Sequence, residues 1–352
     1  DVLVHDNPTM MKCMEDLPGG NARQIPLDDP DTMSIFTSSK VLGYENDEIL
    51  GPTGAVAIPE FNTRFTRQML VDTQPDNFNT LVRLSGFSHG TDVWLGNARD
   101  LIVSGTATVL ETVGCRDDIM LYLISMGLDP KMSFKIMEAV RKGKVKKGGF
   151  SEGWEEAMRE HKVPDWYIES LAKIGYLFPK AHAVAYVMMA FRIAWFKVHE
   201  PLAFYATFFS IRAKAFDAEY CCAGLDAVKR KIREIENNTD ATNVEQDLMV
   251  TLEVCYEFYL RGFHFDTISI YESDATHFRI IGDDALLPPF VSVHGLGEAA
   301  ALATVEQRKG KEFISIEEFA MTCNKLSKTH IEQLKALGAF AGMAETSQVS
   351  LF

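Results

Sequence analysis

Residues 85–98 read Ser-Gly-Phe-Ser-His-Gly-Thr-Asp-Val-Trp-Leu-Gly-Asn-Ala, and this stretch decides how the chain is interpreted. It has neither the apolar period of a core helix nor the alternation of a half-buried strand. Its three glycines let the backbone approach a ligand closely, and free N–H groups beside a helix start attract anions. Because the stretch is hard to explain as packing, we expect a functional loop that leads into a helix. A phosphate-contacting loop and an ordinary ordered loop both fit this pattern.

Residues 86–90 also match G-x-S-x-G, the nucleophile elbow of serine hydrolases. That elbow needs a buried strand before it and a helix after it. The preceding residues, 61–84, carry Arg64, Arg67 and Asp72 among their apolar positions, which is typical of helical or irregular structure. The hydrolase interpretation is therefore the weakest of the three.

Composition indicates an ordinary soluble protein of two or three domains, with 352 residues of which 47% are hydrophobic and 24% charged. The longest uncharged apolar run, residues 183–191, falls short of the ~20 residues of a membrane helix, so we expect no membrane partner. The six cysteines form no C-x-x-C pair, as expected of reduced thiols in a cytoplasmic protein. The chain opens on Asp1 rather than Met, which suggests a fragment or a processed product.

The net charge of −14 argues against binding nucleic acid by bulk electrostatics, but the cations are unevenly distributed. Residues 141–147 contain five cations and are followed by two glycines. This density predicts a phosphate-facing loop. A second basic run, at 229–233, is more easily explained as a solvated helix end.

Helical patterns dominate the chain, which predicts a mainly α fold with minor β structure. A helix is expected at 9–17, and Asp28-Asp29-Pro30-Asp31 signals another helix start. The polar segment 237–247 reads as a linker, with a domain boundary before it near Phe216, and one or two short strands are expected within 262–281. Further helices are expected at 117–126, 132–142, 152–161, 165–174, 181–212 (broken at Pro201) and 252–260.

Two hairpins of the helix-hairpin-helix type are expected after Pro288-Pro289. The first precedes a helix at 298–308, and the second precedes a helix at 331–337. In such hairpins the N–H groups at a helix start bind a DNA phosphate without reading the bases. The expected DNA contacts lie at the two turns, at His294, Gly295, Gly297, Lys325, Ser327 and Lys328.

Taken together, these segments resemble the PolC-type replicative DNA polymerase III of Gram-positive bacteria, a C-family polymerase. The matching motifs occur in the family's order: the loop at 85–98, Cys-Arg-Asp-Asp-Ile-Met at 115–120, Val-Arg-Lys-Gly-Lys at 140–144, Phe-Pro-Lys-Ala-His-Ala with Ala-Tyr at 178–186, and a clamp-binding Gln-Val-Ser-Leu-Phe at 348–352. The resemblance implies the C-terminal portion of such an enzyme. It places the end of the palm at 1–27, the fingers at 28–215, a duplex-binding region at 216–345 with hairpins at about 288–340, and a clamp-binding tail at 346–352.

The resemblance also implies template-directed nucleotidyl transfer from a dNTP to a primer 3′-hydroxyl. The family uses Mg²⁺ in a two-metal site held by three aspartates. Asp1 looks like the third of these, although Val4 stands where the family has glycine. The other two lie upstream, so the metal site is completed by residues absent from this chain, and we expect the chain alone to be inactive.

In the family the fingers bind the triphosphate, and here the implied contacts are Ser85, Gly86, Ser88, His89, Arg116, Arg141, Lys142, Lys144 and Lys180. His182, at a helix start, could protonate the departing pyrophosphate as a general acid. Tyr186 lies one turn further on the same face, where its ring could stack on the nascent base pair. A capping or core role stays open for His182, as does a core role for Tyr186.

The implied partners are primer–template DNA, dNTPs and the sliding clamp, with other replisome proteins possible. Gln348, Leu351 and Phe352 would dock the clamp, because two apolar side chains at the end of a polar tail have no core to join. The alternative function is a non-catalytic DNA- or clamp-binding module.

Overall fold

Helices make up most of the structure, and the strands form one small sheet. The computed structural model describes residues 7–16 and 21–347. Within these ranges the chain folds into two compact units. The first unit contains the described parts of 1–23, 42–50 and 195–352, and the second unit contains 24–41 and 51–194. The prediction of a mainly α fold with minor β structure is confirmed.

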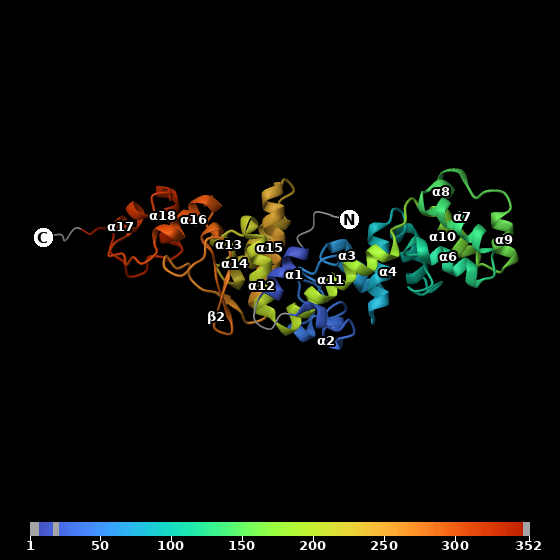
Figure 1. Cartoon of the computed structure of the whole chain (residues 1–352), viewed down its shortest axis with the longest axis horizontal. Helices are drawn as coiled ribbons and strands as arrows, with labels where there is room; N and C mark the ends of the chain where they lie inside the picture. The colour runs from blue at the N-terminus through green and yellow to red at the C-terminus, as the bar shows by residue number, and fades with distance from the viewer. Residues whose placement is uncertain (1–6, 17–20, 348–352) are drawn as a thin grey trace. The chain divides into compact units, whose positions relative to one another are not determined.

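The second unit consists of short helices and loops (Figure 1). Its elements in chain order are α2 (Pro30–Ser34), α3 (Arg64–Thr73), α4 (Phe78–His89), the kinked segment η3 (Trp94–Ala98), α5 (Arg99–Val103), α6 (Arg116–Ser125), α7 (Pro130–Arg141), α8 (Lys144–Gly148), α9 (Trp154–Glu160), α10 (Asp165–Lys173) and the first part of α11 (Lys180–His199). Short 3₁₀ turns, η1 (Ala22–Gln24) and η2 (Lys40–Leu42), lie near the points where the chain passes between the units.

Side-chain caps explain where these helices begin. Asp29 accepts a hydrogen bond from the Thr32 N–H at 2.8 Å, and Pro30 occupies the first turn of α2, which confirms the predicted helix start. Thr63 and Asn77 cap α3 and α4 in the same way. The helices predicted between 117 and 212 are all present, with ends that differ by a few residues, and the break falls at Pro201 as predicted.

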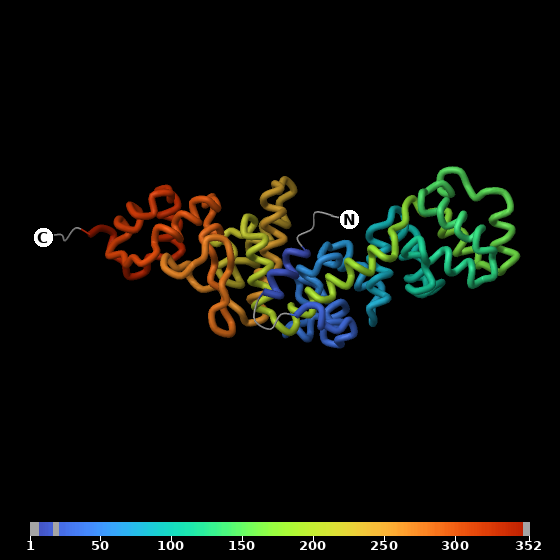
Figure 2. The backbone as a smooth tube through the Cα atoms, viewed as in Figure 1, coloured from blue at the N-terminus to red at the C-terminus, as the bar shows by residue number. Residues whose placement is uncertain are grey.

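The core of the second unit has two parts, a cluster of phenylalanine rings and a group of packed helices. The Phe36 ring lies 5.2 Å from that of Phe61 and 6.2 Å from that of Phe191. Helices α6 to α10 fold against one another in the green part of the tube in Figure 2, with α6 packed on α7 and α10 on α8. Burial of apolar side chains in these clusters stabilises helices too short to persist alone.

The first unit combines helices with a three-stranded sheet. Its elements are α1 (Asn7–Glu15), the end of α11, α12 (Pro201–Ile211), η4 (Ala213–Ala215), α13 (Ala218–Cys221), α14 (Leu225–Glu236), α15 (Asn243–Leu260), β1 (His264–Phe265), β2 (Arg279–Ile281), β3 (Ala285–Leu287), η5 (Phe290–Ser292), α16 (Glu298–Gln307), α17 (Ile316–Thr322) and α18 (Lys328–Ala336). The strand order is β1-β3-β2, with β1 parallel and β2 antiparallel to β3. His264 lies opposite Ala285, and Ile280 lies opposite Leu286.

Helix α15 starts earlier than the sequence analysis predicted. Thr242 and Glu245 form a capping box, so the residues from Asn243 onward are helical rather than linker. The segment is polar because much of its first two turns faces solvent. The prediction of a linker over the whole of 237–247 is therefore wrong for its second half.

A fully buried ion pair lies in the first unit. Nζ of Lys197 is 2.7 Å from Oε1 of Glu257, and both side chains are 0% exposed. The hydroxyls of Tyr205 and Tyr44 donate to the two carboxylate oxygens at 2.6 and 2.5 Å. Burial raises the pKa of both tyrosines, so they remain protonated donors. Arg261 completes the network by donating to the Lys197 carbonyl oxygen at 2.8 Å.

Helix α11 is long and apolar enough, by length and composition alone, to cross a membrane. Its Lys197 is nevertheless paired inside the protein, and Phe191 and Ile193 are fully buried. These surroundings are those of a core helix.

Candidate functional site

The stretch at 85–98 is not a continuous loop. Residues 85–89 are the last residues of α4, and non-helical backbone follows from Gly90. Ser85, Phe87 and Trp94 are buried, and the rings of the last two stack at 5.2 Å. The prediction of a loop is therefore wrong for residues 85–89, and the prediction that the stretch resists explanation as packing is wrong for its buried residues. Ser88 also lies within a helix rather than on a strand-to-helix turn, so the serine-hydrolase elbow is excluded.

The second half of the stretch is a kink held by helix α10. Leu95, Gly96 and Asn97 leave helical backbone angles inside η3. The Asn97 amide donates to the Ser170 carbonyl oxygen at 3.1 Å, and the Ser170 hydroxyl donates back to the Asn97 side chain at 2.5 Å. Burial through a kink has no regular period, which is why the apolar pattern gave no signal here.

One glycine of the stretch permits a close backbone approach. A Cβ atom at Gly86 would clash with the carbonyl oxygen of Gly114, and one at Gly114 would clash with the Arg83 side chain. Helix α4 therefore packs directly against the segment that precedes α6. This contact positions the polar network that follows.

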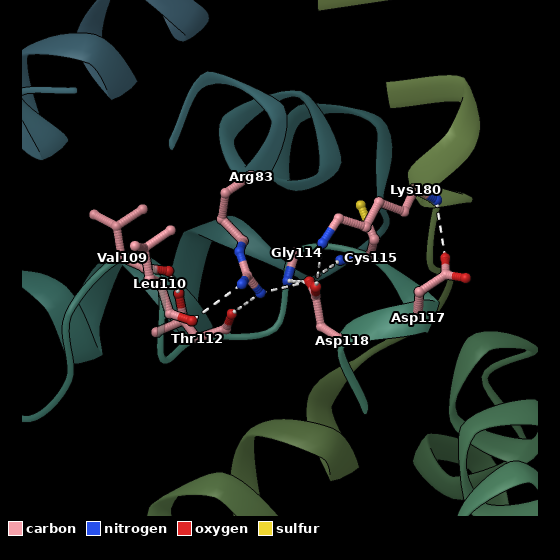
Figure 3. A network of polar contacts seen from close by, with 9 residues as sticks. All are labelled: Arg83, Val109, Leu110, Thr112, Gly114, Cys115, Asp117, Asp118 and Lys180. Carbon is pink, nitrogen blue, oxygen red and sulfur yellow. Dashed lines mark hydrogen bonds and ion pairs between the residues drawn. The ribbon is translucent and has the colours of Figure 1, made fainter. Parts of the chain in front are cut away.

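The carboxylate of Asp118 organises a polar network between α4, α6 and α11 (Figure 3). It accepts hydrogen bonds from the N–H groups of Gly114 and Cys115 at 3.0 and 2.8 Å and pairs with Arg83 at 2.5 Å. Burial raises the pKa of the Cys115 thiol to about 12, so the neutral thiol persists beside this carboxylate. Nζ of Lys180 lies 3.9 Å from the other oxygen of Asp118. Because Asp118 is already shared, the Lys180 charge is only partly compensated.

Two predicted triphosphate contacts are brought to one edge of this network. The Asp117 side chain accepts a hydrogen bond from the Lys180 N–H at 3.0 Å, at the first turn of α11. The Arg116 N–H donates to the Phe178 carbonyl oxygen at 3.3 Å, which joins the start of α6 to the segment before α11. The side chains of Arg116 and Lys180 are 36% and 37% exposed. Both cations are therefore accessible.

Three other predicted residues gather around the ring of Phe178. The rings of His89 and Tyr186 stack on it at 4.7 and 6.2 Å, and the His182 ring meets its edge at 5.8 Å. The aromatic cluster of His89, Phe178, His182 and Tyr186 therefore spans the end of α4 and the start of α11. The predicted functional residues are partly packed against one another here.

Glu60 is a site residue that the sequence analysis missed. Its carboxylate lies 2.5 Å from Nε2 of His89 and accepts a hydrogen bond from the Ser85 hydroxyl at 3.2 Å. The Glu60 side chain is 7% exposed, and its backbone adopts φ +69°, a strained value for a residue with a side chain. No local motif marks Glu60, because its partner His89 lies 29 positions away.

The basic run forms a helix end and a second short helix instead of the predicted loop. Arg141 ends α7, and Lys144 begins α8 after a turn at Gly143. That turn has φ +69°, and a Cβ at Gly143 would lie 2.5 Å from the Gly175 carbonyl oxygen. The loop prediction is therefore wrong, although the charges remain at the surface.

Only part of the charge in this run is free of partners. Arg141 and Lys142 both pair with Glu138, at 3.0 and 2.9 Å. These hydrogen bonds lower the pKa of Glu138 to about 2. Lys146 pairs with Asp92 at 2.5 Å, whereas Lys144 forms no ion pair with any residue that the structure describes.

The two hairpins differ in how their helix starts are satisfied. Gly295 has φ +75°, and α16 begins after Gly297 without a side-chain cap. Helix α18 is capped by Ser327, whose hydroxyl accepts from the His330 N–H at 3.1 Å. The first hairpin therefore leaves its N–H groups available to a ligand, and the second satisfies one of them internally.

Charged side chains beside the hairpins also differ. Nδ1 of His294 lies 3.0 Å from the Asp217 carboxylate, and Glu298 occupies the first turn of α16. Lys325 and Lys328 are exposed beside the second hairpin. The first hairpin therefore offers backbone donors in an acidic setting, and the second offers cations.

No metal site is visible in the described part of the chain. Among residues 7–16 and 21–347, no group of three or more His, Cys, Asp or Glu side chains is placed to hold an ion. Asp1, the predicted metal ligand, lies outside the described residues, as do Gln348, Leu351 and Phe352 of the predicted clamp-binding tail.

Two parts of the chain match known protein families. Residues 7–162 match the bacterial DNA polymerase III alpha subunit finger domain, and residues 262–349 match the helix-hairpin-helix motif. The chain therefore resembles the bacterial DNA polymerase III alpha subunits, and the predicted fingers and hairpin motif are confirmed.

Its similarity to one type of these polymerases extends over the whole chain. It is 52% identical over 353 aligned residues to DNA polymerase III PolC-type of Caldanaerobacter subterraneus subsp. tengcongensis, covering 100% of this chain and 25% of that protein. The PolC-type enzymes of Streptococcus mutans serotype c and Streptococcus pyogenes are 51% and 50% identical, with 100% of this chain and 24% of each relative covered. The chain thus spans about a quarter of the length of these relatives.

Proposed function

We propose that this chain supplies the fingers, the duplex-binding region and the clamp-docking tail of a replicative DNA polymerase. The full enzyme would transfer a nucleotidyl group from a dNTP to the primer 3′-hydroxyl, and it would act in the cytoplasm on the chromosome. The observation that carries the proposal is the edge at the start of α11. There the Asp117 carboxylate accepts a hydrogen bond from the Lys180 N–H and lies 4.0 Å from Nε of Arg116. Asp118 lies 3.9 Å from Nζ of Lys180.

This edge suits a triphosphate because it combines partly uncompensated cations with a helix start. An arginine fork can hold two phosphate oxygens, and a lysine provides a mobile point charge. Arg141, Lys142 and Lys144 would add positive charge from the end of α7 and the start of α8. Glu138 reduces the contribution of the first two, because it already pairs with both.

The aromatic cluster would position the incoming nucleotide. Phe178 restricts the ring of Tyr186, and a restricted ring loses little entropy when a nascent base pair stacks on it. His182, at the same helix start, would hold a proton for the departing pyrophosphate. Among the four predicted contacts in the first motif, Ser88 and His89 are the accessible ones. Ser85 and Gly86 are buried, so any contact they make would act through the backbone they support.

Mg²⁺ would supply charge neutralisation and activation of the primer hydroxyl when bound to the full enzyme. The described residues do not form a site for it. Asp1 remains the proposed ligand from this chain, and the remaining ligands would come from the preceding palm.

The hairpin region would hold duplex DNA through phosphates. Backbone N–H groups at the start of α16 and the exposed Lys325, Ser327 and Lys328 are the proposed contacts, with His294, Gly295 and Gly297 forming the first turn. The proposed limits are 1–27 for the palm end, 28–215 for the fingers, 216–345 for the duplex-binding region and 346–352 for the tail. Gln348, Leu351 and Phe352 would then reach the sliding clamp.

The test uses the polymerase extended upstream of this chain. Asp1→Asn should lower turnover by orders of magnitude and leave primer–template affinity nearly unchanged, because only a metal ligand is lost. Asp28→Asn is a matched control at an exposed position outside the proposed site. Wild-type turnover in Asp1→Asn would contradict the proposed metal role. DNA binding without any turnover in the extended enzyme would favour the non-catalytic module.

A further inference from the structure

Three chain segments of the second unit meet at one basic surface. The Thr91 N–H donates to the Tyr176 carbonyl oxygen at 2.9 Å, and a Cβ atom at Gly143 would lie 2.5 Å from the Gly175 carbonyl oxygen. Helix α8 also packs on α7 and α10. The segments are therefore in direct contact, and together they are called the three-segment surface, which consists of residues 91–96, 141–147 and 173–176.

The charge of the three-segment surface is opposite to that of the chain. The surface carries six cations and one carboxylate, whereas the net charge of the chain is −14. Glu138 pairs with Arg141 and Lys142 at 3.0 and 2.9 Å. Asp92 pairs with Lys146. The other three cations are exposed and form no ion pair with any residue that the structure describes: Lys144, Lys147 and Lys173. Such a surface attracts a polyanion.

Two apolar side chains are exposed at the same surface. Leu95 is 63% exposed and Tyr176 is 40% exposed. Lys173 donates to the Gly96 carbonyl oxygen at 3.0 Å, which places the Leu95 turn beside a free cation. The Tyr176 ring stacks on no other ring within the described ranges, and the hydrogen bond to Thr91 fixes its backbone. An exposed ring on a fixed backbone offers a flat apolar face at a small entropic cost.

Cations beside an exposed ring match the chemistry of a single-stranded nucleic acid. Lysines attract its phosphates, and its unpaired bases have free faces that stack on aromatic side chains. In a duplex the bases stack on one another, so their faces are not available to Tyr176. An acidic peptide would pair with the lysines and leave the ring without a partner. The combination therefore favours a single strand over both alternatives.

We propose that the three-segment surface binds single-stranded DNA. One base stacks on Tyr176 and against Leu95, and Lys147 and Lys173 hold the adjoining phosphates. None of these four residues is assigned to the triphosphate above. The proposal rests on the proposed function for the identity of the strand, which in the polymerase is the unpaired template. Binding is independent of sequence, because every base has a face that can stack.

The experiment titrates the intact chain into fluorescein-labelled oligothymidylate and follows fluorescence anisotropy without dNTP, primer or Mg²⁺. The strand has about a dozen nucleotides, which is within the usual range of site sizes for single strands. An abasic strand of the same length keeps the phosphates and lacks the bases. We expect oligothymidylate to bind and the abasic strand to bind about tenfold more weakly. Loss of one stacked base accounts for a factor of this size.

Two variants separate the ring from the cations. Tyr176→Ala should weaken oligothymidylate about tenfold and leave the abasic strand and a hairpin duplex unchanged, because only stacking is lost. Lys147→Ala/Lys173→Ala should weaken both single strands. It should also lower the slope of log affinity against log salt by about 1.4, since two phosphate contacts are lost.

Matched controls lie in the same unit but outside the three-segment surface. Phe65→Ala removes a ring that is 42% exposed on α3, close to the exposure of Tyr176. Lys131→Ala/Lys135→Ala removes two exposed lysines from α7. Both controls should leave the affinity for oligothymidylate and its salt dependence unchanged.

Three results would overturn the proposal. The first is no saturable binding of oligothymidylate. The second is equal weakening of oligothymidylate and the abasic strand by Tyr176→Ala, because the ring would then be structural only. The third is competition by oligoglutamate as strong as that by unlabelled oligothymidylate, which would assign the surface to acidic peptides. If the lysine pair fails to fold, as judged by circular dichroism, Lys147→Ala replaces it.

The outcome can be distinguished from that of the proposed function. Binding is measured on this chain without catalysis, so failure of the Asp1→Asn test would leave it unaffected. Conversely, a chain that does not bind oligothymidylate contradicts this proposal alone. Lys325→Ala/Lys328→Ala should keep the full affinity for oligothymidylate. A loss in that variant equal to the loss in Lys147→Ala/Lys173→Ala would place the strand on the hairpins and overturn the proposal.

Discussion

Lys180 and Lys197 belong to the same helix, α11, but their surroundings are opposite. Lys197 is 0% exposed and lies 2.7 Å from Glu257, whose two oxygens also accept hydrogen bonds from tyrosines. Lys180 is 37% exposed and lies 3.9 Å from Asp118, a carboxylate already paired with Arg83. The charge of Lys197 is compensated by Glu257, whereas the charge of Lys180 is only partly compensated and can interact with a ligand. Sequence alone does not separate them, because both are single cations in an apolar helix.

The largest effect is expected when one member of the buried Lys197–Glu257 ion pair is removed. Lys197→Met leaves the Glu257 carboxylate buried without its cation, so we expect a loss of about 3–5 kcal/mol in the free energy of unfolding. Urea denaturation of the chain, followed by circular dichroism, measures this loss.

The double variant Lys197→Met/Glu257→Leu should recover much of the stability, because a well-packed apolar pair can replace a buried ion pair. Equal stability of the wild-type protein and Lys197→Met would show that Lys197 is not structural. The contrast with Lys180 would then fail.

The comparison extends to carboxylates, because Glu60 resembles Glu257 in burial but holds an exposed partner, His89. Glu60→Gln keeps the size of the side chain and weakens its contact with His89. We expect kcat/KM for dNTP to fall about tenfold in the full polymerase, roughly 1.4 kcal/mol, with little change in unfolding. Steady-state kinetics and thermal unfolding measure the two effects.

Glu48→Gln is the matched control, since Glu48 is a surface carboxylate paired with Lys229 and Arg233. It should leave kcat/KM unchanged. A fall in stability without any kinetic effect in Glu60→Gln would make Glu60 a structural residue only.

For DNA binding, the same contrast between compensated and available charges is tested at the exposed lysines of the second hairpin. Lys325→Ala/Lys328→Ala should weaken duplex binding and reduce the salt dependence, because two phosphate contacts are lost. The wild-type slope should be shallow, corresponding to on the order of three to five phosphates, since the chain is acidic overall. Fluorescence anisotropy over a range of salt concentrations measures both quantities.

Lys309→Ala/Lys311→Ala is the matched control, because it removes the same charge at exposed positions between the two hairpins in the sequence. It should leave the slope close to that of the wild-type protein. Salt-independent binding, or strong discrimination among duplex sequences, would contradict contact through phosphates.

The smallest effect is expected at Glu138. Its pKa of about 2 in the folded chain lies below the ordinary value, because Arg141 and Lys142 donate hydrogen bonds to it. A carboxylate with a lowered pKa stabilises the fold above its unfolded pKa, and this stabilisation is lost as pH falls from about 4.5 toward 2. Solvent screening at this partly exposed site limits the contribution to about 0.5 kcal/mol.

Unfolding of the wild-type protein and Glu138→Gln should therefore differ at pH 7 and converge near pH 2. A constant difference across that range would show that the Glu138 charge is not responsible.

Much of the fold could be predicted because its signals are local. Asp29 with Pro30 marked a helix start, Pro201 marked a break, and the apolar periods between 117 and 212 marked the helices. The Thr242–Glu245 capping box was present in the sequence but was outweighed by the polar residues around it. Local chemistry thus explains both the success and this error.

The site was less predictable because its contacts are not local. The motif at 85–98 was expected to be a functional loop, yet Trp94 and Asn97 are buried through a kink without any period. Glu60 reaches His89 across 29 positions, and Asp118 collects Arg83 and Lys180 from two other helices. Only the folded chain reveals which lysine of α11 is compensated.

The most direct test of the central claim is a single-turnover titration of dNTP with Lys180→Ala in the full polymerase. Lys131→Ala, at an exposed position of α7, is the matched control. The apparent dNTP affinity should fall about tenfold in Lys180→Ala, roughly 1.4 kcal/mol, while primer–template affinity and the control remain unchanged. Unchanged dNTP affinity with weakened primer–template binding would contradict the account and assign Lys180 to the DNA path.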